Sequence, residues 1–314
     1  MYQPFRHNKN MTLVYGTVCL DLTYRVPTLP AKGGYAEITS ESKTLGGEAA
    51  NTAVALKRWG GKVILVGNPI GTGENAEALK RLLAENGLES AIYPQGDFPA
   101  PVCHIYVTPD GERTMFGRGF AEMERRGDPA LIPYTPGEWF TTDPNHGALA
   151  RQAVLKAHAT GMNVYVLDFF RENEQLPPGC FWQSSTSWVG APGDTYQNKR
   201  WLQGWLKKHQ CTAILTDGAN GFLLGDQKRG IRQLPPYPVD GVVDSTGAGD
   251  VFRAGMLLGL GLGWNLALCL QFAAAAAALN CQSIGATGGL TDRAKVEALV
   301  CAYPEIGEQY QTAV

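Results

Sequence analysis

The sequence predicts an α/β fold built on a mostly parallel sheet with helices on both faces. Short β-branched runs alternate with amphipathic helical stretches along most of the 314 residues. This alternation is typical of parallel sheets, because a helix usually makes the crossover between two parallel strands. The chain is 44% hydrophobic, with 38 glycines and 19 prolines. Length and composition therefore allow a large core with many tight turns, and they exclude a disordered or fibrous chain.

The expected elements follow one another in a regular order. The runs that read as strands occupy residues 13–22, 62–67, 163–169 and 212–218. The runs with apolar residues at helical spacing occupy residues 50–60, 74–87, 150–161, 198–209 and 251–260. Glycine ends the first two helices, at Gly60 and Gly87. The uncharged stretch 254–291 is interrupted by glycines and polar residues, which indicates two buried helices rather than a membrane span.

Two segments break the alternation and predict a small β-sheet lid. Residues 25–45 have no helical periodicity. Residues 101–119 read as a β-hairpin that turns at Asp110-Gly111. The sequence contains no repeat, linker or low-complexity tract. We therefore expect one domain over residues 1–314, with lid strands inserted at about 25–45 and 101–119.

Charge and cysteine content narrow the classes of function. Lys and Arg total 27 and Asp and Glu total 29, for a formal charge of −2. This balance offers no broad basic surface, so nucleic acid is not expected as a partner. The seven cysteines form no C-x-x-C pair, which argues against a zinc site and a disulfide framework and predicts a cytoplasmic protein. The N-terminus is polar and lacks the apolar core of a secretory signal, so no membrane partner is expected either.

The strongest chemical motif is Asp-Ser-Thr-Gly-Ala-Gly-Asp at residues 244–250, directly before the helical run 251–260. Glycines ahead of a helix leave backbone N–H groups free to face an anion, and the helix dipole adds to the attraction. Asp250 would stand at the mouth of such a site, where a carboxylate makes sense as the base for an attacking hydroxyl. An ordinary Asp N-cap on a Gly-rich turn is the alternative.

A second Gly-rich motif, Leu-Gly-Gly-Glu-Ala-Ala-Asn, occupies residues 45–51. Its two glycines would let another molecule approach the backbone closely, and Asn51 can both donate to and accept from a hydroxyl. The two motifs in this order, about 200 residues apart, resemble the signature pair of the ribokinase-like carbohydrate kinases, the phosphofructokinase B (PfkB) type. The resemblance extends over nearly the whole chain.

The resemblance implies a Rossmann-like, doubly wound sheet with a β lid, and transfer of the ATP γ-phosphoryl group to a hydroxyl of a small sugar. Asp250 then matches the catalytic base. The anion hole around the transferred phosphoryl group matches the backbone N–H groups of Gly247, Ala248 and Gly249. The sugar-binding residues of the family match Asp21, Gly46, Gly47 and Asn51. For Asp21, a loop-capping role is the alternative.

The residues that would bind the nucleotide resemble the family less specifically than those that would bind the sugar. Residues 216–221, Thr-Asp-Gly-Ala-Asn-Gly, resemble the segment of the family beside the ATP phosphates and ribose, with a plain β-turn as the alternative. The alanine run 273–278 resembles the helix next to adenine, with close helix packing as the alternative. The candidate ATP contacts are Thr216, Gly218, Gly221, Ala274 and Ala277.

The resemblance implies that the protein binds two kinds of metal ion. Asp244, Thr246 and the loop 283–289 with Gly285 resemble the place where many members bind a monovalent cation, and an all-oxygen set would suit K⁺. Mg²⁺ is expected with ATP, because it neutralises the phosphates. The Asn-x-x-Glu motif that helps to organise Mg²⁺ in most relatives is missing from residues 188–194, where Asp194 is the candidate substitute for the Glu.

Two arginines bear on the charge of the substrate. Arg118 follows the lid hairpin and Arg171 follows the strand 163–169, and both resemble positions in the fructokinase and 2-keto-3-deoxygluconate kinase branches. Two guanidinium groups would suit a sugar carboxylate, whereas a surface role is the alternative for each. Asp143, in the turn Thr-Asp-Pro-Asn, could contact a sugar hydroxyl or form the turn. Neutral and acidic sugars both stay open.

Other classes of function either stay open or are excluded by the sequence. A nucleoside is the chief rival to a sugar as acceptor, and a nucleotide- or sugar-binding protein weakened in catalysis is a second alternative. A dinucleotide-dependent oxidoreductase is excluded, because no G-x-G-x-x-G opens the first helix. The expected partners are thus ATP and a small-molecule sugar, with a homodimer through the lid as a further option.

Overall fold

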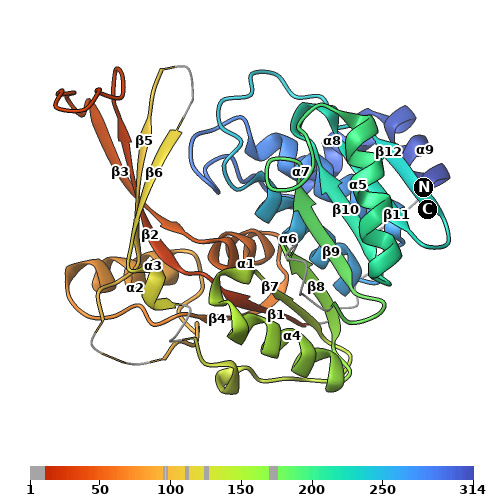
Figure 1. Cartoon of the computed structure of the whole chain (residues 1–314), viewed down its shortest axis with the longest axis horizontal. Helices are drawn as coiled ribbons and strands as arrows, with labels where there is room; N and C mark the ends of the chain where they lie inside the picture. The colour runs from red at the N-terminus through yellow and green to blue at the C-terminus, as the bar shows by residue number, and fades with distance from the viewer. Residues whose placement is uncertain (1–10, 95, 97, 110–112, 124–126, 170–175) are drawn as a thin grey trace.

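Two sheets organise the chain in the computed structural model, which describes all residues except 1–10, 95, 97, 110–112, 124–126 and 170–175 (Figure 1). The parallel strands of the larger sheet are β1 (Met11–Gly16), β4 (Lys62–Gly67), β7 (Trp139–Thr142), β8 (Asn163–Leu167), β9 (Phe181–Ser185) and β10 (Thr212–Thr216). An antiparallel edge is added by β11 (Phe222–Asp226) and β12 (Gly230–Leu234). The spatial order is β12-β11-β10-β9-β8-β7-β1-β4.

Helices cover both faces of this sheet, as predicted. On one face, α1 (Glu48–Arg58), α6 (Ala248–Gly261) and α7 (Leu266–Asn280) share a core with Val14 and Ile214. On the other face, α4 (Ala148–Ala159) and α5 (Thr195–Lys208) pack with Leu13 and Phe140. The remaining helices are α2 (Glu74–Glu85), α3 (Phe120–Met123), α8 (Arg293–Ala302) and α9 (Pro304–Ala313).

The uncharged stretch forms two buried helices, α6 and α7, which pack against each other as the sequence predicts. Within the part of the chain that the structure describes, no helix is both long enough and apolar enough to cross a bilayer.

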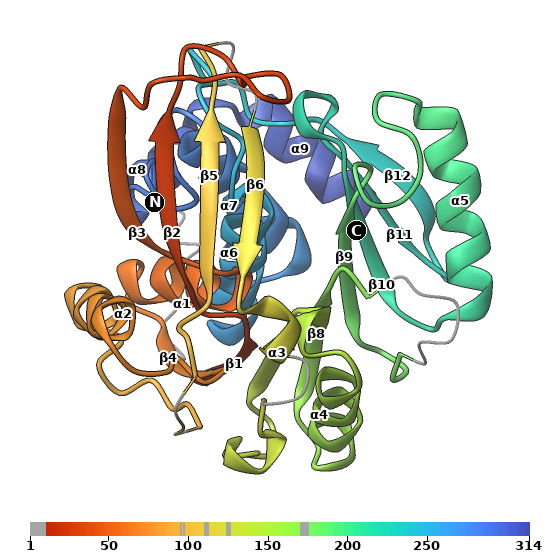
Figure 2. The same cartoon turned by 60° about the vertical axis from the view of Figure 1, so that its left-hand side comes forward.

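The lid is a separate four-stranded sheet (Figure 2). Its strands are β2 (Cys19–Arg25), β3 (Ser40–Gly46), β5 (Val102–Val107) and β6 (Arg113–Arg118), in the order β3-β2-β5-β6. β5 and β6 pair antiparallel, so the predicted hairpin is confirmed, while its turn at 110–111 lies outside the described residues.

The prediction of one continuous strand over residues 13–22 is wrong. The chain leaves the large sheet after Gly16, whose φ of +150° favours glycine, and enters the lid at Cys19. Between them, the buried Asn68 side chain accepts a hydrogen bond from the Val18 N–H at 2.7 Å and donates to the Val18 carbonyl at 3.1 Å. Asp21 therefore lies on a lid strand rather than at the end of the first strand of the large sheet.

The sheet order reverses at β1, whose neighbours β4 and β7 lie on its two sides. Open α/β sheets bind ligands outside the carboxyl ends of the strands at such a reversal. Here Thr17, just after β1, donates its N–H to Asp143 Oδ2 at 2.9 Å and its hydroxyl to Oδ1 at 3.2 Å. Asp143 directly follows β7, so this bond joins the two strand ends where a site is expected.

Candidate active site

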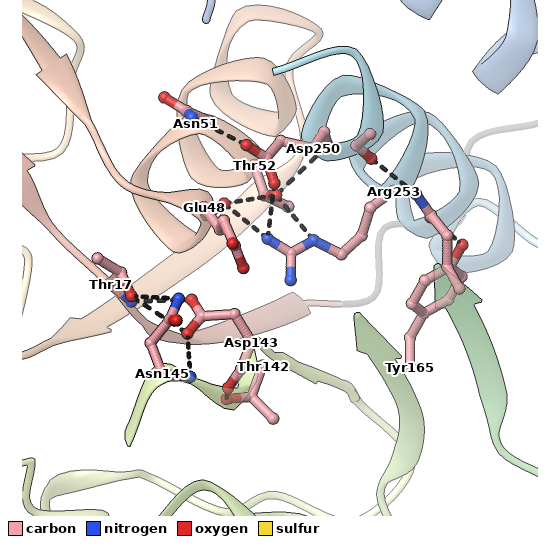
Figure 3. Close-up of polar contacts among 12 residues, drawn as sticks. Thr17, Glu48, Asn51, Thr52, Thr142, Asp143, Asn145, Tyr165, Asp250 and Arg253 are labelled. Carbon is pink, nitrogen blue, oxygen red and sulfur yellow. Dashed lines mark hydrogen bonds and ion pairs between the residues drawn. The ribbon is translucent and has the colours of Figure 1, made fainter. Parts of the chain in front are cut away.

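The two predicted motifs meet at the carboxylate of Asp250 (Figure 3). This residue lies in the first turn of α6 and is only 5% exposed. Asn51 of α1, 199 positions away in the chain, donates from Nδ2 to Asp250 Oδ2 at 2.9 Å. Arg253 of α6 approaches the other oxygen, with Nη2 at 3.3 Å from Oδ1. The carboxylate is thus held from two sides.

The surroundings of Asp250 bring its pKa close to neutral pH. Burial raises the pKa of Asp250 to about 7, and the nearby Asp143 and Asp168 add to this rise, whereas Arg253 and the hydrogen bond from Asn51 oppose it. A proton acceptor works best when its pKa lies near the operating pH. The carboxylate of Asp250 could therefore accept a proton near neutral pH.

The turn before α6 depends on Gly247. This residue has φ +71° and provides no side-chain cap, so it leaves the first N–H groups of the helix without a side-chain acceptor at that end. A Cβ at this position would lie 2.2 Å from the carbonyl oxygen of Ala286. Of the predicted anion-hole groups, the N–H of Ala248 donates to the Ser245 carbonyl at 3.3 Å, whereas a Cβ on Gly249 would make only an ordinary contact, 3.7 Å from Gln183 Nε2.

Two buried amides that the sequence patterns missed hold this turn. Asn280 of α7 donates to the carbonyl of Ala286 at 3.0 Å and to that of Thr246 at 3.4 Å, which ties two loops together. Gln183 of β9 donates to the carbonyl of Gly249 at 2.9 Å. Both side chains are at most 1% exposed. A polar residue inside an otherwise apolar strand or helix is the signal that could have found them.

A cavity of about 560 Å³ lies between the lid and the loops near residues 242–246 and 284–286. Asp21 is part of its lining, together with hydroxyl side chains of the lid strands. Burial raises the pKa of Asp21 to about 6, although a hydrogen bond from the Cys19 thiol opposes the rise. The cavity thus offers a carboxylate and hydroxyl groups, which suit a polyhydroxylated ligand.

Gly46 and Gly47 pack against the residues around this cavity. A Cβ on Gly46 would lie 2.1 Å from the carboxyl carbon of Asp21. Gly47 has φ +98°, and a Cβ there would lie 2.3 Å from the carbonyl oxygen of Thr17. Any side chain at either position would therefore clash with a neighbouring residue of the same chain. At Gly46 the residue that would have to move is Asp21.

Arg118 does not line the cavity, and the expectation that it faces the substrate needs correction. It pairs with Val102, which is buried against the core, whereas Arg113 pairs with Val107 on the cavity side. Because side chains alternate along a strand, positions 113 and 118 point to opposite faces. The arginines that line the cavity are Arg113 and Arg25, and Arg171 lies outside the described residues.

The predicted cation residues come together, but their donors and acceptors are already matched. Asp244 Oδ1 accepts from the Thr246 N–H at 2.8 Å, from the Thr246 hydroxyl at 2.5 Å and from Arg113 Nη1 at 2.8 Å, while Oδ2 accepts from the Gly285 N–H at 2.9 Å. Partial burial alone would raise the pKa of Asp244, but these bonds bring it below its ordinary value. Arg113 fills the place of a cation, so this carboxylate does not fit a K⁺ site as packed.

We expect turnover to be equal in potassium and in tetramethylammonium buffers of the same ionic strength, because Arg113 already supplies positive charge to Asp244. The sequence alone instead predicts that potassium binds at this site and activates the enzyme. In Arg113→Ala the carboxylate loses that partner, and potassium should then increase the rate. The measurement is kcat in the two buffers for both proteins. A clear loss of wild-type activity without potassium would contradict this assignment.

Two further candidates act as caps in the structure. Asp143 is fully buried and, besides its bond to Thr17, accepts from the Asn145 N–H at 3.1 Å at the start of the 3₁₀ turn 144–146. Asp194 caps α5 and accepts from the N–H and the side-chain amide of Gln197 at 2.9 and 2.8 Å. Among the described residues, no group of three His, Cys, Asp or Glu side chains is placed to hold a metal ion. Asp194 is engaged as a helix cap, and its role toward Mg²⁺ stays a prediction.

The candidate nucleotide residues lie on the far half of the sheet. Thr216 ends β10, and its hydroxyl donates to the Ser184 carbonyl at 3.2 Å. Gly218 has open space at its Cβ position, whereas a Cβ on Gly221 would lie 2.0 Å from the Leu234 carbonyl oxygen, so Gly221 is explained by packing. On α7, Ala274 is buried in the core and Ala277 packs partly buried beside it.

Comparisons with known proteins agree with this geometry. The model of the pfkB family carbohydrate kinases matches residues 9–129 and 186–293. An uncharacterized sugar kinase of Dictyostelium discoideum is 30% identical over 329 residues, which cover 87% of this chain and 92% of that protein. The fold and the comparisons define a phosphotransferase that acts on an alcohol group. The chain belongs to the PfkB family of carbohydrate kinases.

Solved structures agree on the ribokinase-like fold. Arabidopsis thaliana ribokinase, complexed with ribose and ATP, matches with a TM-score of 0.73 and 19% identity, over 93% of this chain and 99% of that one. A Burkholderia thailandensis nucleoside kinase in complex with inosine matches with a TM-score of 0.72 and 19% identity, over 93% and 97%. At such identities the likeness shows the fold alone.

Proposed function

We propose that this protein transfers the γ-phosphoryl group of ATP to a hydroxyl of a small, neutral sugar. Asp250 takes the proton from that hydroxyl, and the N–H groups at the start of α6 stabilise the charge on the transferred group. The observation that carries the proposal is the pairing of Asn51 with Asp250 at the start of a helix whose N-terminus has no side-chain cap. The free Oδ1 of Asn51, buried without a partner among the described residues, can accept from the substrate hydroxyl.

The lining of the cavity supports a neutral acceptor. The side chains of the lining that can bind hydroxyl groups include Asp21, Thr23, Thr39 and Thr44. Arg118 faces away from the cavity, and Arg113 is paired with Asp244, so of these arginines only Arg25 in the lining could meet a sugar carboxylate. The relative solved with ribose and ATP supports a sugar acceptor, and the one solved with inosine keeps a nucleoside as the second candidate.

The nucleotide is proposed to lie over the far half of the sheet. Gly218, with open space beside it, and Thr216 at the end of β10 would face the phosphates and ribose. Mg²⁺ would arrive bound to the ATP phosphates and keep most of its other ligands as water, as is usual for this ion. This route fits a chain in which Asp194 is engaged as a helix cap.

A coupled ADP-release screen tests this function directly. The panel would contain neutral pentoses and hexoses, acidic sugars and nucleosides, each with Mg·ATP. We expect turnover above the background ATPase rate with a neutral sugar. Turnover with nucleosides alone would replace the proposed acceptor class. Thermal stabilisation by ATP and a sugar without any turnover would identify a binding protein and contradict the proposal.

Asp21→Ala should raise KM for the sugar about 10- to 150-fold, the range of a lost hydrogen bond to a charged group, and leave KM for ATP unchanged. In the wild type, KM for the sugar should also rise as the pH falls through about 6, because the carboxyl then takes up a proton. The variant should lack that rise. Glu41→Ala, on the exposed part of β3, is the matched control. An unchanged sugar KM in Asp21→Ala would remove Asp21 from the site.

A further inference from the structure

Arg253 is a fully buried cation that neither motif includes. It lies on α6, one turn after Asp250, and its side chain is 0% exposed. From α6 it reaches across to α1 (Figure 3). Its Nε donates to the Thr52 hydroxyl at 2.9 Å, and its Nη2 donates to the Glu48 carbonyl at 2.6 Å. Nη2 also lies 3.3 Å from Asp250 Oδ1, so the guanidinium joins both helices to the carboxylate.

These contacts fix Arg253 independently of its ion pair with Asp250. Thr52 accepts from Arg253 and donates its hydroxyl to the Glu48 carbonyl at 2.9 Å, within the first turn of α1. The same threonine hydroxyl lies 3.3 Å from the Asp250 carbonyl. A planar guanidinium held at two of its nitrogens has little freedom to rotate. Its position relative to Asp250 is therefore set by α1.

Carboxyl groups surround this guanidinium on several elements. Arg253 lowers the pKa of Glu48 on α1, of Asp168 at the end of β8 and of Asp250 on its own helix, whereas Asp143 at the end of β7 raises all three. Burial raises the pKa of Glu48 well above its ordinary value, and that of Asp168 to about 6. Several acidic groups thus compete for one buried guanidinium.

One nitrogen of the Arg253 guanidinium has no hydrogen-bond partner among the described residues. Nη1 of Arg253 and Oε2 of Glu48 are both buried and have no hydrogen-bond partner among the described residues. A buried charge without full pairing is costly. The charge of Arg253 lowers the pKa of Asp250, the carboxylate with which it is in direct contact.

We propose that Arg253 is the positioning residue of the reaction: clamped to α1, it holds the carboxylate of Asp250 toward the acceptor and keeps it ionised. The proposal rests on the proposed function of Asp250 as the base. In the reaction, Asp250 accepts the hydroxyl proton of the sugar while the sugar oxygen bonds to the γ-phosphorus and the bond to the ADP oxygen breaks. Asp250 afterwards releases the proton to solvent. Arg253 neither gains nor loses a proton.

The dependence of kcat on pH tests this role. Without the guanidinium, Asp250 should bind its proton more tightly, so the acid limb of kcat should move upward by about 1–3 pH units in Arg253→Met and Arg253→Gln. With a wild-type pKa of about 7, each variant should then be about 5- to 500-fold slower at pH 7 and recover much of the difference at high pH. Arg253→Lys, which keeps the charge, should show a limb between those of the wild type and the neutral variants. Arg58→Met, at the exposed end of α1, should behave as the wild type.

A loss of activity that is the same at every pH would overturn the proposal, because a purely structural defect does not change the acid limb. Circular dichroism and thermal melting identify the variants that fold, and either neutral variant suffices to decide. The Asp250→Asn variant distinguishes a failure of the proposed function from a failure of the proposed role of Arg253. If Asp250→Asn keeps the wild-type rate and acid limb, Asp250 is not the base and the proposed function fails with it. If Asp250→Asn is inactive and the Arg253 variants keep the wild-type acid limb, only the role of Arg253 is wrong.

Discussion

Asp250→Asn is expected to lower kcat by about 10²–10⁴-fold while KM for ATP changes little. The amide has the size of the carboxylate, so the contact with Asn51 and the start of α6 should survive, but the amide cannot take a proton from the acceptor. In the wild type, kcat should rise with pH through about 7, because burial places the pKa of Asp250 there and the base must be ionised. The measurement is kcat against pH for both proteins.

The control for this substitution is Asp226→Asn. In the wild type, the Asp226 carboxylate at the end of β11 pairs with Arg229 at the surface, away from the candidate site. Its kcat should equal that of the wild type at every pH. Turnover of Asp250→Asn within a few-fold of the wild type would show that another group takes the proton.

Gly247→Ala should cost about 10²–10³-fold in kcat, the effect of losing an oxyanion-hole donor. A methyl group at this position would meet the Ala286 carbonyl oxygen at 2.2 Å, and φ +71° is unfavourable for alanine. The turn must then shift, and the N–H groups at the start of α6 shift with it. Single-turnover rates and a thermal melt would separate this effect from unfolding.

Two other glycines provide the comparison. Gly249→Ala should lose much less activity than Gly247→Ala, because its added methyl group would make only an ordinary contact, 3.7 Å from Gln183 Nε2. Gly204→Ala, on α5 with open space around it, should keep full activity. If Gly247→Ala were as active as Gly204→Ala, the geometry of this turn would not matter for transfer.

Sequence patterns predicted the fold wherever an element was long and periodic. The helices α1, α2, α4 and α5 and the strands β4, β8 and β10 appear where the spacing of apolar residues indicates them. The strands β7 and β9 were not predicted, because β7 has only four residues and β9 reads Phe-Trp-Gln-Ser-Ser, which lacks the apolar β-branched run seen in β8 and β10. The break between β1 and β2 was also missed, since it depends on Asn68, a residue 50 positions away from Val18.

The family resemblance assigned Asn51 and Asp250 to the same sugar site, but the hydrogen bond between their side chains was not predicted. Arg253 was not predicted, since an arginine inside a helical run carries no local sign that it will be buried. The assignment of Arg118 failed for a related reason. Which of two arginines on one strand faces a cavity depends on the register of β6 against β5, and a shift by one residue reverses the face.

Transfer of labelled phosphate from [γ-³²P]ATP to the best acceptor of the screen, with its product identified by mass spectrometry, tests the central claim most directly. The account predicts that the label appears on a hydroxyl of a small neutral sugar, that omission of the sugar abolishes the product, and that Asp250→Asn forms it at least about 100-fold more slowly. Label found only as inorganic phosphate with every acceptor, or equal transfer by Asp250→Asn and the wild type, would contradict it.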